Sequence, residues 1–595
     1  MNKHKSHISP EDILIDQLNL PSFDHSQLEG RIIKPIANYI FYLIIFFVLA
    51  VFAWFWFNSY KLQIVKGEYY DNKAENNRFE TTPIFSARGV IYDRNKFPLA
   101  WNEETATTTS ATSTDNTQIR KYIDTNGIGN LLGYIKFPKR DKNGFYINKN
   151  VETVGGIEKF YNEDLNGKAG SFYSEIDSAG NLISQNTVDL PENGKDVYLT
   201  IDHDIQKALF ETFKKAGQES GYNGGVALIA DVKDGSILAA VTYPDFDSNV
   251  MFDGTDVEKI TKYINDPRSI FLNRYVDGLY APGSIVKPMF ALAGLNEGVV
   301  VPEEKILSIG KLVVPNPYNP GQNTIFKDWK AHGYTNVREA IAVSSDVYFY
   351  TIGGGVPGKK GLGISRLEEY SKYFGLADRY DDTFFKSKPS VIPTPEWKLK
   401  VFNGDIWRLG DTYNSSIGQY GFSVSPIQVL GMTMMLARDA KDVPEFKINT
   451  AEPTRYIDIP EKLKKIDSKY YNEISEGMRL TVTAGTAKSL DFEGLKLAGK
   501  TGTAQTGNRN QFINSWFVGF WPYTDPKYAI VYMLEKGPST NTRGAASYLR
   551  EFLQSCSAYQ CDLENKNKKN VLEPVTLPEP GILEEIEVPT ASSTE

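Results

Sequence analysis

Residues 281–294 read APGSIVKPMFALAG, and this stretch decides the fold. Pro282 and Gly283 end one element, and the mostly apolar run after them predicts a buried helix that opens at Ser284. Positions i and i+3 of a helix share a face, so we expect Lys287 beside Ser284. A serine with its own base predicts a nucleophile, and the helix N-terminus favours its alkoxide. The alternative for this motif alone is a capping serine with a solvated lysine.

A second motif follows at residues 344–346, which read SSD. Ser344 would relay a proton to a leaving amine, and Asp346 would orient that serine or hold a lysine. On its own the motif is more often a pair of helix-capping residues. Its value comes from its place after the first motif and before a third one.

The third motif is Lys500-Thr501-Gly502-Thr503, in a stretch expected to be a strand. Alternate residues of a strand share a face, so Thr501 and Thr503 point together. Lys500 would bind a substrate carboxylate and keep the lysine of the first motif neutral by repulsion. Gly502 would let a substrate backbone approach closely. The N–H of Thr503, with that of Ser284, would form an oxyanion hole.

The same short patterns also occur elsewhere in the chain, so context has to separate them. Ser308 begins a second S-x-x-K, but its surroundings predict a strand or loop, where i and i+3 point apart. Residues 113–115 (STD) lie in a Thr/Ser tract, and residues 539–541 (STN) also fit the second pattern. Only the set at 284, 344 and 500 has the order and setting of a site for opening amide bonds.

The composition excludes several other classes of function. The formal net charge of −8 argues against nucleic acid as a partner. None of the five histidines has metal-ligand spacing, so a metal site has little support. Cys556 and Cys561 would form a small disulfide loop or stay as two thiols, and the sequence leaves both open.

A membrane anchor is predicted at residues 36–57, an apolar run without a charged side chain. At 1.5 Å per residue it spans about 33 Å, enough to cross a bilayer. The run is too long for the core of a signal peptide, so we expect it to be retained. Flanking positive charges nearly balance and do not set the orientation.

Strand-like runs lie near both ends of the region after residue 195, and helical patterns lie between them. One pair occupies residues 225–231 and 236–242, and the other occupies residues 513–520 and 528–534. This arrangement predicts an α+β domain whose sheet unites the two ends of the region. The tail after residue 561 is acidic and proline-containing, which predicts disorder.

Several longer motifs resemble those of the class B penicillin-binding proteins, the D,D-transpeptidases of peptidoglycan synthesis. They read RGVIYDRN at 88–95, GGIE at 155–158, LNGKAG at 165–170, GDT at 410–412 and WFVGF at 516–520. Asp346 and the IPTPEW segment at 392–397 make the chain most similar to the elongation-type penicillin-binding protein 2. Lys96 and Tyr420 depart from the family, which usually has glycine at both positions, and the pedestal after Asn102 is short.

The resemblance implies five segments: 1–35 a short cytoplasmic segment, 36–57 the anchor, 58–194 a mainly β pedestal, 195–561 the transpeptidase domain and 562–595 a disordered acidic tail. The transpeptidase domain would have a central antiparallel sheet flanked by helices. It would lie outside the inner membrane, where Ser284, Lys287, Ser344, Asp346 and Lys500 would cross-link stem peptides through a serine acyl-enzyme. The reaction would need neither a metal nor an organic cofactor. β-Lactams would inhibit it, and a membrane glycosyltransferase of the elongation machinery would be its partner.

Four alternatives remain at this point. A division-type transpeptidase of the same family would share every motif. A membrane-anchored serine β-lactamase would hydrolyse β-lactams rapidly. A β-lactam sensor normally needs a cytoplasmic output region, for which 35 residues leave no room. A catalytically idle scaffold would have lost a motif, and none is lost here.

Overall fold

The computed structural model describes residues 38–66, 79–104, 118–124, 127–138, 150–176, 182–316, 319, 321–381, 383–492 and 494–558. These residues fall into two compact units, one within Met1–Thr81 and Tyr173–Asn186, the other within Thr82–Phe172 and Thr187–Glu595. The predicted domain boundary at residue 195 lies inside the second unit and stays a prediction. The predicted cytoplasmic segment and acidic tail, residues 113–115, the side chain of Cys556 and all of Cys561 lie outside the described residues.

The N-terminal apolar run forms helix α1 (Asn38–Tyr60), which continues as a π-helix, η4 (Lys61–Val65). The stretch Tyr42–Val65 is long and apolar enough to cross a membrane. Its large apolar side chains are exposed along the helix, including Phe46, Phe52 and Trp56. A helix that is apolar on every side and packs against no core fits a single membrane anchor.

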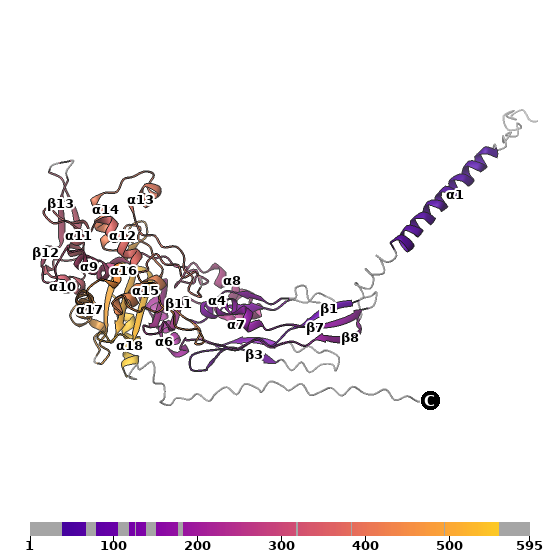
Figure 1. Cartoon of the computed structure of the whole chain (residues 1–595), viewed down its shortest axis with the longest axis horizontal. Helices are drawn as coiled ribbons and strands as arrows, with labels where there is room; N and C mark the ends of the chain where they lie inside the picture. Colours follow the sequence, from indigo (N-terminus) through magenta and orange to yellow (C-terminus); the bar gives the residue numbers. More distant parts are fainter. Residues whose placement is uncertain are drawn as a thin grey trace, which may run out of the picture. The chain divides into compact units, whose positions relative to one another are not determined.

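The pedestal is mainly β, as predicted (Figure 1). One sheet has the order β4-β3-β2-β9, and two smaller sheets have the orders β1-β7-β8 and β5-β6. The strands are β1 (Phe79–Ile84), β2 (Ile91–Tyr92), β3 (Pro98–Glu104), β4 (Gln118–Tyr122), β5 (Tyr134–Lys136), β6 (Glu152–Val154), β7 (Gly170–Ile176), β8 (Leu182–Asp189) and β9 (Val197–Tyr198). Three short helices accompany them: α3 (Gly129–Leu132), α4 (Gly156–Phe160) and α5 (Asn162–Asn166).

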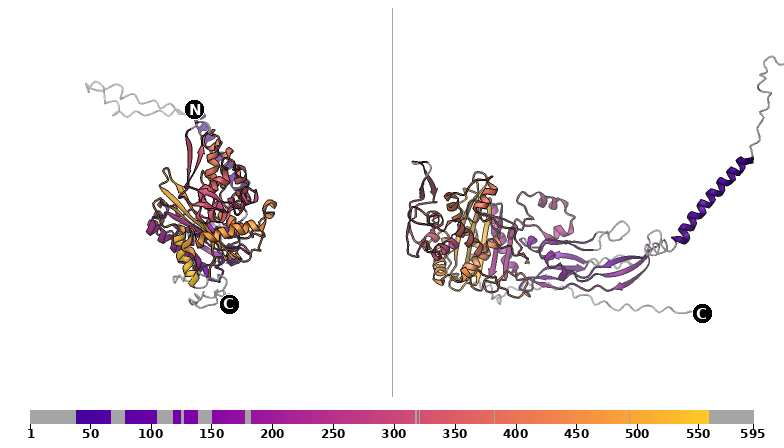
Figure 2. Two further views of the ribbon diagram at one scale, coloured as in Figure 1. Left: turned by 90° about the vertical axis from the view of Figure 1, so that its left-hand side faces the viewer. Right: turned by 45° about the horizontal axis from the view of Figure 1, so that its top comes forward.

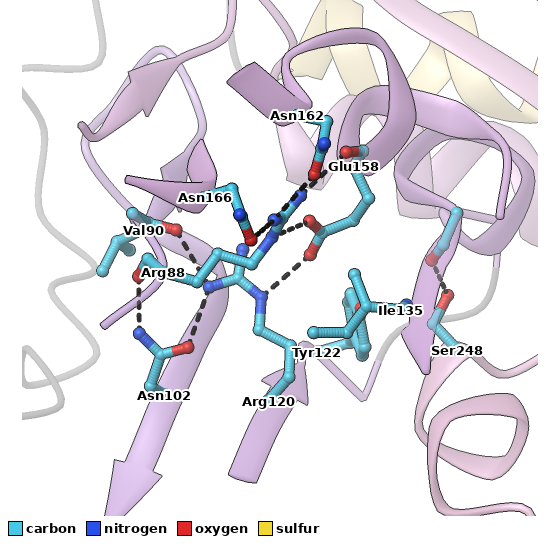
Figure 3. A network of polar contacts seen from close by, with 12 residues as sticks. Arg88, Val90, Asn102, Arg120, Tyr122, Ile135, Glu158, Asn162, Asn166 and Ser248 are labelled. Carbon is cyan, nitrogen blue, oxygen red and sulfur yellow. Dashed lines mark hydrogen bonds and ion pairs between the residues drawn. The ribbon is translucent and has the colours of Figure 1, made fainter. Parts of the chain in front are cut away.

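A buried ion-pair network joins the pedestal motifs (Figure 3). The carboxylate of Glu158 accepts from Arg88 Nε at 2.6 Å and from Arg120 Nε at 2.8 Å, and its side chain is fully buried. Arg88 also donates to Asn162 and Asn166. Burial raises the pKa of Glu158, but the two guanidinium groups outweigh it and hold the pKa below its usual value. Motifs far apart in sequence therefore meet around one carboxylate.

A tight turn at residues 93–97, between β2 and β3 of the pedestal, contacts the start of helix α6 (His203–Ser220). The Asp93 carboxylate accepts from the N–H groups of Asn95 and Phe97 at 2.7 and 2.8 Å and contacts His203 Nδ1 at 2.8 Å. Within this turn Lys96 has a φ of 63°, in the left-handed region that favours glycine. The backbone therefore explains why relatives have glycine where this chain has lysine.

The transpeptidase region is built on one antiparallel sheet of order β11-β10-β18-β17-β16. The strands are β10 (Gly224–Asp231), β11 (Ile237–Tyr243), β16 (Ala498–Thr506), β17 (Phe512–Trp521) and β18 (Tyr528–Pro538). β10 pairs with β18 so that Leu228 lies opposite Val531. The prediction that the sheet unites both ends of the region is confirmed.

Helices cover both faces of this sheet (Figures 1 and 2). On β18, Tyr532 points to the face where its ring stacks on Phe213 of helix α6, while Val531 and Met533 join the core on the other side. The helices are α6 (His203–Ser220), α7 (Ser248–Asp253), α8 (Val257–Asn265), η5 (Gly283–Val286), α9 (Lys287–Asn296), α10 (Val337–Val343), α11 (Asp346–Gly354), α12 (Gly363–Tyr373), α13 (Pro395–Val401), α14 (Leu409–Ser416), α15 (Pro426–Ala437), α16 (Glu461–Lys464), α17 (Ser468–Thr483), η6 (Lys488–Leu490) and α18 (Ala545–Ala558).

Two small sheets interrupt the helices between the first and second motifs. They pair β12 (Ile306–Ser308) with β15 (Gly333–Thr335), and β13 (Lys311–Pro315) with β14 (Asn323–Lys327). Figure 1 shows the β13–β14 hairpin standing out from the region, away from the central sheet.

Candidate active site

The first motif opens a helix at the predicted place. Residues 283–286 form the 3₁₀ turn η5, and α9 continues from Lys287. Residues i and i+3 of a 3₁₀ turn eclipse each other, so Ser284 and Lys287 lie on one side of the helix. Ser284 is partly exposed, whereas Lys287 is fully buried. A reachable hydroxyl therefore lies one turn from a lysine that water does not reach.

The Lys287 ammonium is held by the second motif. Its Nζ donates to the Ser344 carbonyl at 2.9 Å, to Ser344 Oγ at 3.3 Å and to Asp346 Oδ1 at 2.6 Å. Within the described part of the chain none of its hydrogen bonds goes to Ser284. Of the two roles considered for Asp346, the geometry fits the one in which it holds a lysine.

The second motif is the turn between α10 and α11. Ser344 ends α10 with a φ of 58°, and Ser345 caps α11 by accepting from the N–H of Tyr348 at 3.4 Å. Capping is thus the task of Ser345, while Ser344 Oγ faces Lys287. One serine pair serves both the cap and the site.

Asp328 is a buried carboxylate beneath this turn, and the sequence analysis missed it. It accepts from Ser345 Oγ at 2.9 Å, from the N–H of Val347 at 3.1 Å and from Ser308 Oγ at 3.0 Å. Burial raises the pKa of Asp328, but hydrogen bonds from the N–H groups of Val347 and Asp346 outweigh it and keep the pKa below its usual value. The rival serine Ser308 is therefore engaged in supporting the second motif.

The third motif lies on the edge strand β16, with Lys500 turned inward and fully buried. Lys500 Nζ donates to the carbonyl of Thr501 at 2.9 Å. Burial lowers the pKa of Lys500 far below its usual value, and the positive charge of Lys287 lowers it further. This shift belongs to Lys500, so the expectation that Lys500 keeps Lys287 neutral stays a prediction.

Thr501 and Thr503 lie on the outer side of β16, while Gly502 faces η5. Thr501 Oγ1 lies 2.5 Å from Thr486 Oγ1. A Cβ at Gly502 would lie 2.8 Å from Ile285 Cγ2, which is too close for an ordinary contact. The close approach expected for this glycine is therefore made by the helix that carries Ser284, and it sets the distance between the first and third motifs.

Two family models match the chain over these elements. The penicillin binding protein transpeptidase domain matches residues 225–554, more than half of the chain. The chain belongs to the penicillin-binding protein transpeptidase family. The penicillin-binding protein dimerisation domain matches residues 104–199, which overlap most of the predicted pedestal and extend past its predicted end at residue 194.

Individual members of the family align along most of the chain. The peptidoglycan D,D-transpeptidase MrdA of Haemophilus influenzae is 27% identical over 86% of this chain and 91% of its own length. Pseudomonas aeruginosa PBP2, solved in complex with WCK 5153, is 26% identical with a TM-score of 0.61, covering 83% of this chain and 100% of that chain. A chain in the complex between PBP2 and MreC from Helicobacter pylori is 24% identical with a TM-score of 0.64, and the match covers 82% of this chain and 99% of that chain. The partner in that complex is MreC, not the glycosyltransferase that the sequence analysis named.

The loop at residues 418–420, where penicillin-binding proteins usually have Gly-Gln-Gly, supports the first motif. The N–H of Gly283 donates to the carbonyl of Gly418 at 2.9 Å. Tyr420, in place of the usual glycine, has a φ of 63°. Its ring stacks on Phe402 at 6.1 Å and meets Trp397 edge-on at 6.0 Å. These contacts offset the cost of a left-handed tyrosine, about 1–2 kcal/mol.

Across the described ranges, no group of three or more His, Cys, Asp or Glu side chains is arranged to hold a metal ion.

Proposed function

We propose that this chain is a serine-type peptidoglycan D,D-transpeptidase with Ser284 as nucleophile. The observation that carries the proposal is the fully buried Lys287, whose Nζ lies 3.3 Å from Ser344 Oγ and 2.6 Å from Asp346 Oδ1. A base, a relay and a carboxylate thus converge one helical turn from a partly exposed serine.

In the acylation step Ser284 Oγ attacks the carbonyl carbon of the penultimate D-Ala of a stem peptide, and Lys287 takes the hydroxyl proton in its neutral amine form. The C–N bond breaks, and the proton passes through Ser344 to the amine of the departing D-Ala. The amine of a neighbouring stem peptide then attacks the ester, displaces Ser284 and forms the cross-link, while a proton of that amine passes through Lys287 to Ser284 Oγ. Proton transfer runs along the short contacts between Lys287 and Ser344.

Substrate binding is assigned to β16. Thr501 and Thr503 lie on the outer side of the strand, where an extended peptide can pair along the sheet edge. The N–H groups of Ser284 and Thr503 would bind the developing oxyanion, and one such donor is worth about 10²–10³ in rate. Binding of the substrate carboxylate would favour the protonated form of Lys500, whose pKa is lowered by burial in the free protein. Gly502 packed against η5 supports this arrangement, since it fixes β16 beside Ser284.

Labelling with fluorescent penicillin tests the nucleophile. Full-length protein should form a stable adduct that peptide mass mapping places on Ser284, and Ser284→Ala should abolish it. Ser308→Ala is the matched control, because Ser308 begins the other S-x-x-K, and it should label normally. Lys287→Ala should remove acylation while the fold is kept, since the base is lost. An adduct on Ser308 would overturn the assignment. Rapid release of hydrolysed drug would favour a β-lactamase.

The cellular role that we propose is cell-wall elongation. The MrdA relatives and the PBP2 structures support the elongation type over the division type. The matched models describe a dimerisation and a transpeptidase domain, so glycan polymerisation is assigned to a membrane glycosyltransferase partner. Depletion in the native cell should cause rounding, whereas filaments with unfinished septa would indicate division.

The proposed topology places the N-terminus in the cytoplasm and the transpeptidase domain outside. The helix α1 fits a single anchor, and the cell-wall substrate lies on the outer side. Protease added to spheroplasts should remove the transpeptidase domain and spare a short N-terminal fragment. Protection of residues 195–561 would reverse the orientation.

A further inference from the structure

The β13–β14 hairpin carries a charged and apolar surface that the transpeptidase reaction does not use. We define the hairpin face as Lys311, Val313, Ile325 and Lys327, together with Trp329, which follows β14. In the ladder Lys311 lies opposite Lys327, and Val313 lies opposite Ile325. Residues two apart in a strand share a side, so these four side chains form one surface.

This face is open, although the opposite face of the hairpin is packed. Val313 is 39% exposed, Ile325 51% and Trp329 57%. On the other side Phe326 contacts the rings of Tyr350 and Tyr413, with centroids 5.8 and 4.9 Å apart. The hairpin is therefore fixed on one side and presents the other to solvent.

The charges on the hairpin face lack acidic partners. Among the described residues, neither Lys311 nor Lys327 forms an ion pair, although the chain as a whole carries a net charge of −8. Like charges directly opposite each other in a strand pair are destabilising. Two facing lysines beside an exposed Val–Ile pair therefore favour an anionic partner that also has apolar surface.

The hairpin face adjoins the second motif. The residue after β14 is Asp328, whose carboxylate accepts from Ser345 Oγ at 2.9 Å. Trp329 Nε1 donates to the carbonyl of Val343 at 3.2 Å, directly before Ser344. A ligand on this face would thus lie beside the turn that carries the second motif.

We infer that the hairpin face binds a peptidoglycan strand next to the stem peptide that is being cross-linked. Such a strand carries peptide carboxylates for Lys311 and Lys327, and its sugar rings have apolar faces that suit the exposed Trp329 and Ile325. This inference rests on the proposed function, and it adds a strand-binding surface outside the three motifs.

Co-sedimentation of full-length protein with purified peptidoglycan sacculi tests the inference. The protein is first acylated with penicillin, so that binding through Ser284 is blocked. The double variant Lys311→Gln/Lys327→Gln should lose roughly tenfold in affinity at low salt, and the difference should shrink as salt is added. The control Lys207→Gln/Lys233→Gln removes two other exposed lysines that form no ion pair among the described residues, and it should bind normally.

Two readouts separate failure of the inference from failure of the proposed function. Both double variants should label with fluorescent penicillin at the wild-type rate, because a small β-lactam does not reach the hairpin face. Normal labelling with unchanged sacculus binding in Lys311→Gln/Lys327→Gln overturns the inference alone. The same holds if that variant loses binding to anionic lipid vesicles but not to sacculi, or if it changes only self-association. Absence of labelling in the wild type would instead remove the proposed function.

Discussion

Asp328 offers the sharpest test of how this site is positioned, because it touches the second motif without being one of its residues. Three donors converge on its Oδ2 atom, namely Ser308 Oγ at 3.0 Å, Ser345 Oγ at 2.9 Å and the N–H of Val347 at 3.1 Å, while the N–H of Trp329 donates to Oδ1 at 2.9 Å. Asp328→Ala leaves all three without their acceptor. A hydrogen bond to a charged group contributes about 1.5–3 kcal/mol, so the turn before α11 should loosen while the rest of the domain stays folded.

The expected effect on acylation follows from the geometry around Lys287. Ser344 and Asp346 hold its ammonium, and both are part of the turn that Asp328 fixes. A displacement of about 1 Å at a reacting group can cost about 10²-fold in rate. We therefore expect fluorescent penicillin to acylate the Asp328→Ala protein about 100-fold more slowly than wild type. The loss should lie mainly in the rate of the acylation step rather than in the initial binding of the drug.

Two matched variants make this prediction sharper. Asp328→Asn keeps one oxygen acceptor in place and should recover most of the rate. Ser308→Ala removes one donor, a hydrogen bond worth about 0.5–1.5 kcal/mol, and should acylate within about threefold of wild type. A folded Asp328→Ala protein that acylates at the wild-type rate would refute the positioning role.

Three further predictions concern the pedestal and its connection. Glu158→Gln should lower the free energy of unfolding in urea by about 3–5 kcal/mol, because it leaves buried guanidinium groups unpaired. Glu192→Gln removes an exposed ion pair with Lys168 and should lower it by less than about 1 kcal/mol. Equal effects of the two variants would contradict this account. Burial raises the pKa of Asp93 and lowers that of His203, but the hydrogen bond and opposite charges of this pair outweigh it, so the pKa of Asp93 lies below 3.8 and that of His203 above 6.5. The contribution of the pair should be complete between these values and lost as pH falls through the folded pKa of Asp93 or rises through that of His203; a flat titration of wild-type stability that matches His203→Gln would argue against it. Lys96→Gly should raise stability by about 0.5–1 kcal/mol in thermal unfolding, since it relieves a left-handed lysine, and a loss of stability would show that Lys96 makes a compensating contact.

The elements that the sequence predicts well are those set by local pattern. The helix opening at Ser284, the strand that carries Lys500, and the strand pairs at both ends of the region follow from residues close together in the chain. Periodicity and turn residues determine which side chains share a face over a few residues. The apolar run that became α1 is readable for the same reason, since length and composition alone decide it.

The two departures from the family pattern show what local sequence patterns cannot predict. Lys96 and Tyr420 appear in the sequence only as substitutions at positions where relatives have glycine. The structure gives both a φ of 63°, which explains the usual glycine. For Tyr420 it also supplies the contacts with Trp397 and Phe402 that offset the strain.

By itself the sequence determined the anchor, the order of the three motifs and the α+β sheet that unites the ends of the region. Only the tertiary structure decided that Asp346 holds Lys287, that Gly502 packs against η5 and that Ser308 acts through Asp328. The reason is physical. A residue's type fixes which groups it can bond to, but its partner depends on how distant segments of the chain pack together. Ser308 and Lys287 have the chemistry of many serines and lysines, and the fold alone selects which of them reaches the site.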